Sequence, residues 1–507
     1  MSHLFKTNKK LVFFYKLMKI FIIFSLIVLI YFGFQSYTGN KFLYLLFSII
    51  SNYLIFFAFR KKAIFFETFF SLLLWLGFWF KFTCTISFTS GNFKEGVGLF
   101  DYSKFLFNES LIVSTIGLVA FIFSGHFREI FLFNYPNKLE KINLKNNFFL
   151  FGQKKIWFIF FILILAIGIL NFHFKIYQKG LLPIYELNFL ISGSFKWLLL
   201  FGLSSISALL IFYEFNFFRK FFLTSSFLAI FETFISSFSM LSRGMIFNSL
   251  AIIYGIYKFS NKINKRNNFG YYLKSIFFIF VFFYISVSSV NYIRSNYFYV
   301  GKSSEFSIEL LTKKKEKPNY EIDIDIKDKP ITFEKNNSEI FYLLINRWVG
   351  IDGVMSVVSK KELLNIPFLL SAFEERAKPD APTFYELTFE LESMNSSSAN
   401  LYKNVKGNTL PGIIAFSYYS GSYIILFLII FFISILASYI ELTAFKFSSK
   451  NMIFSALIGQ VIAFRFIHFG YLPHQSYLLF GTIILTIIII FILNILLKKN
   501  FFQKNKL

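Results

Sequence analysis

The chain contains many apolar segments of roughly twenty residues, and their length limits the folds that it can adopt. A helix of that length crosses the hydrocarbon layer of a bilayer, which is ~30 Å thick. A soluble chain of 507 residues would instead bury its apolar residues in one to three compact cores. We therefore predict an all-α polytopic membrane protein. About twelve transmembrane helices are expected, near residues 17–37, 42–59, 63–82, 110–126, 156–173, 195–213, 220–239, 244–259, 273–292, 418–440, 451–468 and 476–497.

The formal net charge of +25 is distributed as a membrane topology requires. If the N-terminus is cytoplasmic, every connection on the cytoplasmic side carries at least two basic residues, whereas outside connections such as "SMLSRG" and "HFGYLPHQS" carry few. This is the positive-inside pattern of membrane proteins. The basic charge therefore indicates topology, with both termini in the cytoplasm, and we expect no nucleic-acid partner.

One connection is much longer than the others and divides the chain into three parts. Residues 1–292 are expected to form a bundle of about nine spans, 293–417 a large periplasmic loop, and 418–507 about three more spans. The loop contains "YEIDIDIK", which alternates like a strand. It continues with "SEIFYLLINRWVGIDGVMSVVSKKELL", whose apolar residues, including Trp348 and Ile351, recur at helical spacing. This amphipathic stretch is interpreted as a helix on the membrane face or as a lid over a site, and the two interpretations are compatible.

Four arginines are expected on the outer side, against the positive-inside trend. Arg243, in "SMLSRGMIF", lies at the joint between the seventh and eighth spans. Arg294 and Arg347 follow the ninth span, in "SVNYIRSNYFYVG" and "INRWVGIDG", and Arg465 lies inside the eleventh. An arginine near a span end can snorkel as an interface anchor, but charges at membrane depth are usually functional or paired.

Two histidines lie close to Arg465. His468 follows it by one helical turn, and His474 lies just beyond Pro473. Guanidinium groups bind phosphate in a bidentate manner, so the diphosphate of a polyprenyl-linked sugar is a suitable ligand for the arginines. Displacement at the anomeric carbon requires that the leaving diphosphate be stabilised. It also requires that His468, His474 or Asp352 accept the proton of the acceptor hydroxyl.

Three further residues complete the candidate substrate-binding set. Ser242 and Gly244 flank Arg243, and Tyr471 lies between the two histidines.

The acids of "EIDIDIK" lie in a polar part of the loop and are interpreted as solvated, so we expect neither a metal nor another cofactor. The single cysteine, Cys84, excludes a disulfide within the chain and a thiolate metal cluster.

The layout and three short motifs resemble those of the Wzy-type oligosaccharide repeat-unit polymerases. The motifs are "SRG" at an outer joint, "RWVGIDGV" in the loop and "KGNTLPGIIAFSYYSGS" before the tenth span. The resemblance implies a GT-C-like glycosyltransferase of the bacterial inner membrane. Such an enzyme transfers a growing O-antigen, capsule or exopolysaccharide glycan from undecaprenyl diphosphate to the next lipid-linked unit, without nucleotide sugar or metal. The resemblance also implies that Arg243 and Arg347 bind the diphosphate, and that a chain-length regulator and a flippase are partners.

Other functions stay open. O-antigen ligases usually carry a histidine in the large outer loop, and this chain has none between His173 and His468. Transferases that use a metal and lipid-phosphate sugars usually have acids in the first outer loop, and "SYTGNK" has none.

A transporter, such as a flippase for the same oligosaccharide, often has helices broken by glycine or proline near the midplane. The chain has nine prolines in all, several of them in the long loop, which argues against a transporter. A structural membrane protein without activity is the fourth interpretation.

Overall fold

The protein is helical throughout the part of the chain that the structure describes. The computed structural model describes residues 9–89, 91, 93, 97–132, 134–136, 148–179, 187–263, 269–298, 345–376, 383–390, 410–470 and 473–498. Within these ranges no strand occurs, and seven helices are long and apolar enough to cross a membrane. They are Lys41–Ala58, Phe65–Phe88, Lys104–Phe131, Gly152–Phe174, Leu190–Phe218, Gly270–Ile293 and Tyr423–Phe447.

These helices confirm the prediction of an all-α polytopic membrane protein. Four shorter apolar helices also fall on predicted spans, namely Ile20–Ser36, Leu223–Ser239, Met452–Ile467 and Ser476–Ile492. The count of twelve spans stays a prediction. The strand-like segment "YEIDIDIK" and the first half of the amphipathic stretch lie outside the described residues.

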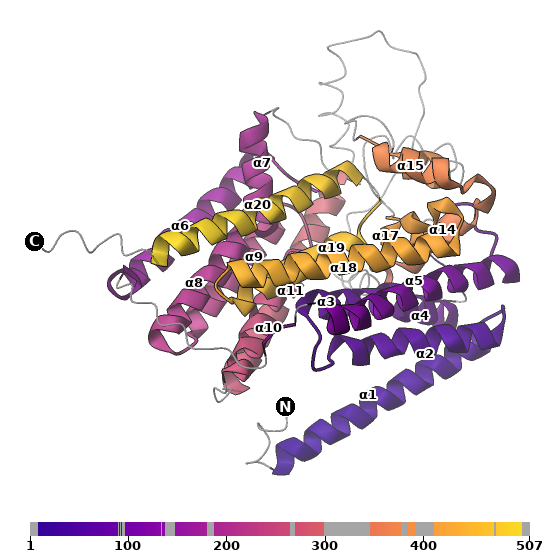
Figure 1. Cartoon of the computed structure of the whole chain (residues 1–507), viewed down its shortest axis with the longest axis horizontal. Helices are drawn as coiled ribbons and strands as arrows, with labels where there is room; N and C mark the ends of the chain where they lie inside the picture. The colour runs from indigo at the N-terminus through magenta and orange to yellow at the C-terminus, as the bar shows by residue number, and fades with distance from the viewer. Residues whose placement is uncertain are drawn as a thin grey trace, which may run out of the picture.

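The helices form three groups along the chain (Figure 1). The first group contains α1 (Lys9–Ser36), α2 (Lys41–Ala58), α3 (Phe65–Leu74), the π-helical turn η1 (Trp75–Phe80), α4 (Lys81–Phe88) and α5 (Lys104–Phe131). The second contains α6 (Phe148–Phe174), α7 (Phe189–Trp197), η2 (Leu198–Gly202), α8 (Leu203–Phe218), α9 (Leu223–Ser239), α10 (Ile246–Lys262) and α11 (Phe269–Phe298). The third contains α18 (Tyr423–Phe447), α19 (Met452–Ile467) and α20 (Pro473–Lys498).

Short elements from the long loop complete the structure near one end of α18. They are α14 (Ile351–Val358), η3 (Lys361–Leu363), α15 (Ile366–Glu374), η4 (Glu386–Glu390), α17 (Gly412–Ser417) and η6 (Tyr418–Ser420). In Figure 1, α15 lies at the edge of the molecule, and α14 and α17 lie closer to the bundle.

Helix α19 is the centre of the bundle. It packs against α3 of the first group and α10 and α8 of the second, and also against α18. Every residue of α19 is buried except Phe464 and Arg465. Gly459 makes the closest approach possible, because a Cβ atom there would lie 2.7 Å from the Phe66 backbone nitrogen. The two groups of helices are therefore joined through a helix that comes late in the sequence.

The loop segment before and within α14 is inserted into the bundle. Gly350 packs directly on Gly77 in η1, where an added Cβ would lie 2.0 Å from the Val349 carbonyl oxygen. All eight residues of α14 are buried, and α14 contacts α5 and α17. Lys361 in η3 extends this attachment through an ion pair of 2.7 Å with Glu109 of α5. The described part of the amphipathic stretch is thus a packed element of the core rather than a helix lying flat on the membrane face.

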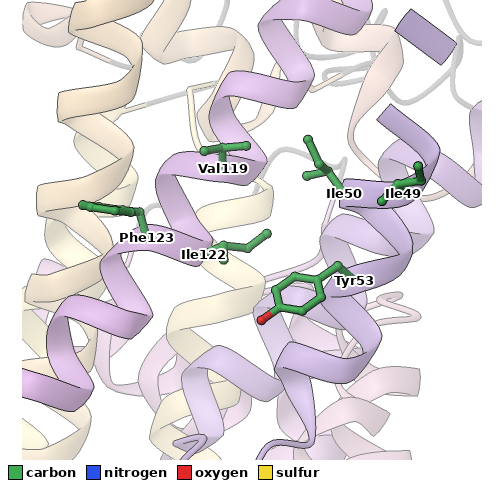
Figure 2. A pocket seen from close by; sticks show the side chains of 6 residues that line it. All are labelled: Ile49, Ile50, Tyr53, Val119, Ile122 and Phe123. Atoms are coloured by element: carbon green, nitrogen blue, oxygen red, sulfur yellow. The ribbon is translucent and has the colours of Figure 1, made fainter. Parts of the chain in front are cut away.

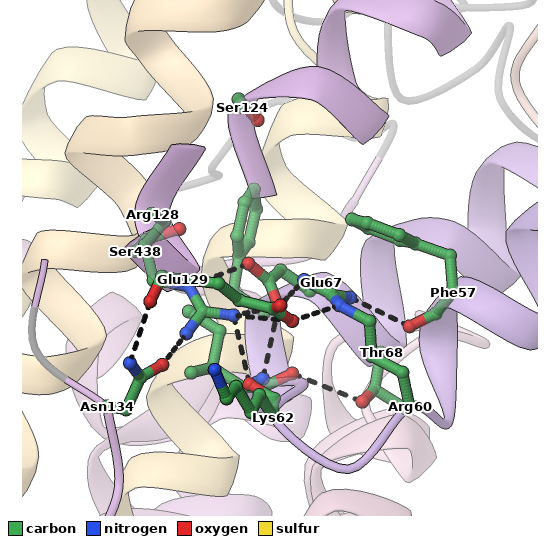
Figure 3. A network of polar contacts seen from close by, with 12 residues as sticks. Phe57, Arg60, Lys62, Glu67, Thr68, Ser124, Arg128, Glu129, Asn134 and Ser438 are labelled. Carbon is green, nitrogen blue, oxygen red and sulfur yellow. Dashed lines mark hydrogen bonds and ion pairs between the residues drawn. The ribbon is translucent and has the colours of Figure 1, made fainter. Parts of the chain in front are cut away.

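A buried ionic network holds together the ends of α2, α3 and α5 that are predicted to be cytoplasmic (Figure 3). The Arg128 guanidinium binds both carboxylate oxygens of Glu67, at 2.9 and 2.7 Å. Arg60 donates to Glu67 at 2.8 Å and also pairs with Glu129. Glu67 and Arg128 are almost completely inaccessible to solvent. The arrangement compensates each buried charge with an opposite one, as a low-dielectric interior requires.

A second buried acid, Glu441 of α18, binds the start of α3. Its carboxylate accepts hydrogen bonds from the backbone N–H groups of Phe65 and Phe66 and from the Tyr135 hydroxyl. The first N–H groups of a helix have no partner within the helix and carry partial positive charge, so a carboxylate there is stabilising. Glu441 thus attaches α18 to α3.

We expect Glu67→Ala to destabilise the protein strongly, because the buried Arg128 guanidinium loses the carboxylate that binds it at 2.9 and 2.7 Å, whereas Arg60 keeps its pair with Glu129. Breaking a buried pair in this way costs about 3–5 kcal/mol. The measurement is the melting temperature of the detergent-purified protein. Lys61→Ala, a change at an exposed residue of the same α2–α3 connection, serves as the control. Equal melting temperatures for the two variants would show that the network contributes nothing to stability.

Candidate functional site

The Phe464 ring, near the C-terminal end of α19, is surrounded by basic groups from distant parts of the chain. The Lys179 ammonium lies 5.7 Å from the centre of this ring, and the His468 ring lies 4.1 Å from it. The backbone N–H of Lys179 donates to the Met240 carbonyl at 2.9 Å, which fixes the segment after α6 to the α9–α10 turn. Gly244 in that turn also packs on Phe464, because a Cβ there would lie 2.8 Å from the ring.

Arg465, the next residue, lies among further basic groups. Its Nε atom is buried and has no hydrogen-bond partner among the described residues. The guanidinium interacts electrostatically with Tyr177, and the Lys196 ammonium lies 5.5 Å from the Tyr177 ring. A buried donor without a partner is costly, so this side chain is well placed to bind an anionic ligand.

His468 follows the last residue of α19 and is held in one orientation. Its Nδ1 atom donates to the Phe464 carbonyl at 2.8 Å, so the proton of the neutral ring is on Nδ1 and Nε2 keeps its lone pair. The Lys179 ammonium and the Arg465 guanidinium also act electrostatically on this imidazole. In the neutral ring, Nε2 is able to accept a proton.

The turn that carries Arg243 has a tightly determined backbone. Leu241 has a φ of 50°, a left-handed conformation that is uncommon for a residue with a side chain. The Ser242 N–H donates to the Ser237 carbonyl at 2.8 Å, and the Ser242 side chain is buried. With Gly244 against Phe464, this turn holds Arg243 at the end of α19 that carries Arg465 and His468.

The loop segment with Arg347 reaches the same place through aromatic contacts. The Phe247 ring of α10 lies 6.2 Å from the Trp348 ring and 6.1 Å from the Phe464 ring. The side chain of Arg347, next to Trp348, is exposed. Three of the four predicted arginines therefore belong to segments that meet around Phe247 and Phe464. Arg294 lies in α11, but its side chain is not among the described ones. Tyr471 lies outside the described residues altogether.

Asp352 takes part in a buried ion pair. Its carboxylate pairs with the ammonium of Lys81 of α4, which also donates to the Trp348 carbonyl at 3.1 Å. Both side chains of the pair are buried. Burial raises the pKa of the Asp352 carboxyl, whereas Lys81 lowers it. The pair fastens the start of α14 to α4, so the location of Asp352 supports a structural role, and its predicted role as a base stays a prediction.

Two cavities lie outside this basic cluster. One lies between α2 and α5, has a volume of about 300 Å³ and exposes only apolar surface (Figure 2). It is lined by Ile49, Ile50, Tyr53, Val119, Ile122 and Phe123. Ile49 and Phe123 are 66% and 57% exposed, which places this hollow on the lipid-facing surface. The other cavity, at the start of α20, is lined in part by the predicted residue His474.

Lys179 and Lys196 belong to the cluster but were not predicted from the sequence. Lys179 could have been found, because it follows the fifth span on the predicted outer side and breaks the positive-inside pattern in the way that Arg243 does. Glu232 is not a partner of the arginines. It accepts hydrogen bonds from Ser204 and Ser236 inside the bundle, at 2.7 and 2.9 Å.

We expect Asp352→Ala to lower the melting temperature of the purified protein, since Lys81 would keep an uncompensated charge at a cost of about 3–5 kcal/mol. The double variant Lys81→Met with Asp352→Leu should recover most of the loss, because a buried pair can be replaced by apolar residues of similar volume. Glu362→Gln, an exposed change in η3, is the control. A double variant no more stable than either single change would contradict the structural role.

Comparison of the chain with protein-family models, with curated proteins and with solved structures finds no match. The function must therefore be inferred from the residues of this chain and their geometry.

Proposed function

We propose that this protein is a membrane glycosyltransferase that polymerises undecaprenyl-diphosphate-linked oligosaccharide repeat units. In this proposal the chain has twelve spans and a GT-C-like layout in the bacterial inner membrane, both termini are cytoplasmic, and the site faces the periplasm. The observation that carries the proposal is the group of cations around Phe464. Lys179 and Arg465 lie there, together with the segments that hold Arg243 and Arg347.

A diphosphate attached to a lipid accounts for the position of these cations. Charged side chains near membrane depth are costly and generally have an anionic partner or a functional role. The charges of Lys179 and Arg465 act on His468, and no acidic residue among the described ones acts on it or on Arg465. A diphosphate would supply a negative charge at Arg465, while its polyprenyl chain would lie along the apolar helices.

The transfer reaction needs stabilisation of the leaving group and a base. The acceptor hydroxyl oxygen forms a bond to the anomeric carbon, and the bond from that carbon to the diphosphate oxygen breaks. Arg465, Lys179 and the other arginines stabilise the negative charge that develops on undecaprenyl diphosphate. His468 Nε2 takes the proton of the hydroxyl. A bound diphosphate would also stabilise the positive charge that the His468 ring gains when it takes this proton.

A flippase for the same lipid-linked oligosaccharide is the second candidate, favoured by a polar cluster inside the membrane. The π-helical turn η2 interrupts the helix Leu190–Phe218, and the Leu200 carbonyl in it accepts a hydrogen bond of 2.9 Å from Asn248. Asn248 also donates to Ser204, which donates to the buried Glu232. Interrupted helices with an internal charge are typical of transporters.

Deletion of the gene in its host, with complementation by variants, tests the proposal. Arg465→Gln and Lys179→Gln should each remove most of the polysaccharide ladder on a gel and leave a single repeat unit on the acceptor. Loss of one group that stabilises a developing charge reduces turnover by about 10²–10³-fold. Lys104→Gln, an exposed cation at the predicted outer end of α5, should restore the full ladder.

The other outcomes separate the alternatives. Long glycans that accumulate on lipid, with none on the acceptor, would identify a ligase. Lipid-linked single units that accumulate while the acceptor carries no glycan would identify a flippase. An unchanged ladder after deletion would refute all three functions in glycan assembly.

A further inference from the structure

A polar cavity of about 390 Å³ lies where the end of α15 meets the start of α20. Its volume is within the range of about 300–1,000 Å³ that is usual for small-molecule sites. The lining residues are Phe373, Glu374, Glu375, Arg376, His474 and Tyr477. Its lining therefore combines two carboxylates, a guanidinium, an imidazole, a phenol and an apolar ring.

Ring contacts connect this cavity to the end of α19. Phe373 packs on Phe416 at 4.9 Å between ring centres, and Phe416 packs on Phe469 at 5.1 Å. Phe469 is also 6.5 Å from the Tyr477 ring. Since Phe469 is the residue directly after His468, the cavity lies beside the turn that carries the proposed base.

The wall of the cavity is held in place, and its polar groups stay available. Glu375 accepts a hydrogen bond of 2.7 Å from the Phe384 N–H, and the Tyr477 hydroxyl donates to the Phe373 carbonyl at 3.3 Å. Burial raises the pKa of Glu375, the Phe384 N–H lowers it, and the nearby Glu386 raises it. The side chains of Glu374 and His474 and the second oxygen of Glu375 form no hydrogen bond with any described residue.

These groups favour an uncharged, hydroxyl-rich ligand over an ion. The two carboxylates outnumber the single guanidinium, so an anion would be repelled. A divalent cation lacks the ligands it needs, because no three His, Cys, Asp or Glu side chains in the described ranges are placed to hold a metal. Sugar hydroxyls can donate to Glu374 and Glu375 and accept from Arg376, while Phe373 and Tyr477 can contact the apolar faces of the ring.

We propose that this cavity binds an uncharged sugar residue of the acceptor glycan. The identification of that glycan as the acceptor rests on the proposed function, whereas the binding of carbohydrate does not. With the donor diphosphate at Arg465 and the acceptor sugar here, the two substrates would bind on either side of the turn that carries His468 and Phe469. The arrangement separates the site into an anionic-lipid half on α19 and a carbohydrate half on α15 and α20.

Direct binding of oligosaccharide tests the cavity. The probe is the free oligosaccharide released by mild acid from the lipid-linked pool of the host, titrated against the full-length protein in detergent by saturation-transfer NMR. We expect Glu375→Gln and Tyr477→Ala to raise the Kd about tenfold or more, as when a polar group loses its hydrogen bond to a ligand. Glu375→Gln keeps the oxygen that Phe384 binds, so the fold is retained, and the melting temperature checks this.

Matched controls are Glu362→Gln and Tyr439→Ala, which change exposed residues away from the cavity and should bind the oligosaccharide as the unchanged protein does. The proposal is overturned if the unchanged protein does not bind the oligosaccharide, or if both cavity variants bind it with unchanged Kd.

Arg465→Gln distinguishes the cavity from the proposed function. If Arg465→Gln keeps the polysaccharide ladder while the cavity variants lose oligosaccharide binding, polymerisation through the arginines fails and the carbohydrate site stands. If Arg465→Gln loses the ladder while the cavity variants bind normally, the carbohydrate site fails and the proposed function stands.

Discussion

The burial of α19 on nearly all sides is the constraint on which the rest of the structure depends. This helix joins the first and second groups of helices, and its only residues that are not buried, Phe464 and Arg465, lie near its C-terminal end. The candidate site is thus attached to a helix that is packed on nearly all sides. Sites on rigid elements hold their side chains more accurately than sites on loops, and Arg465 and His468 gain that accuracy from α19.

The charged side chains at the two ends of the bundle are compensated in different ways. At the predicted cytoplasmic end, Glu67 compensates Arg60 and Arg128, and Glu441 compensates the N-terminus of α3. At the other end, the described residues place Lys179 and Arg465 around Phe464 with no acid acting on Arg465. The first arrangement is complete without a ligand. In the second, an anion would compensate the charge of Arg465, which is why this end of the bundle is proposed as the active site.

Much of the helical layout could be predicted from the sequence, because span length and the positive-inside pattern are local properties. The meeting of the segments that carry Arg243, Arg347 and Arg465 could not be derived from the sequence, since it depends on the contacts of Phe247 with two rings far away in the chain. The partner of Asp352 could not be predicted. Lys81 comes 271 positions earlier at the end of a predicted span, where a lysine is commonly an interface residue.

The contact of Gly77 with Gly350 has a consequence for the order of assembly. Chains emerge from the ribosome with the N-terminus first, so η1 enters the membrane long before residue 350 is made. The slot beside Gly77 has no occupant during that interval, and the position of α19 beside α3 is vacant for even longer. The N-terminal helices must therefore persist in the bilayer as an incomplete bundle until α19 is made, and the candidate site cannot form before then.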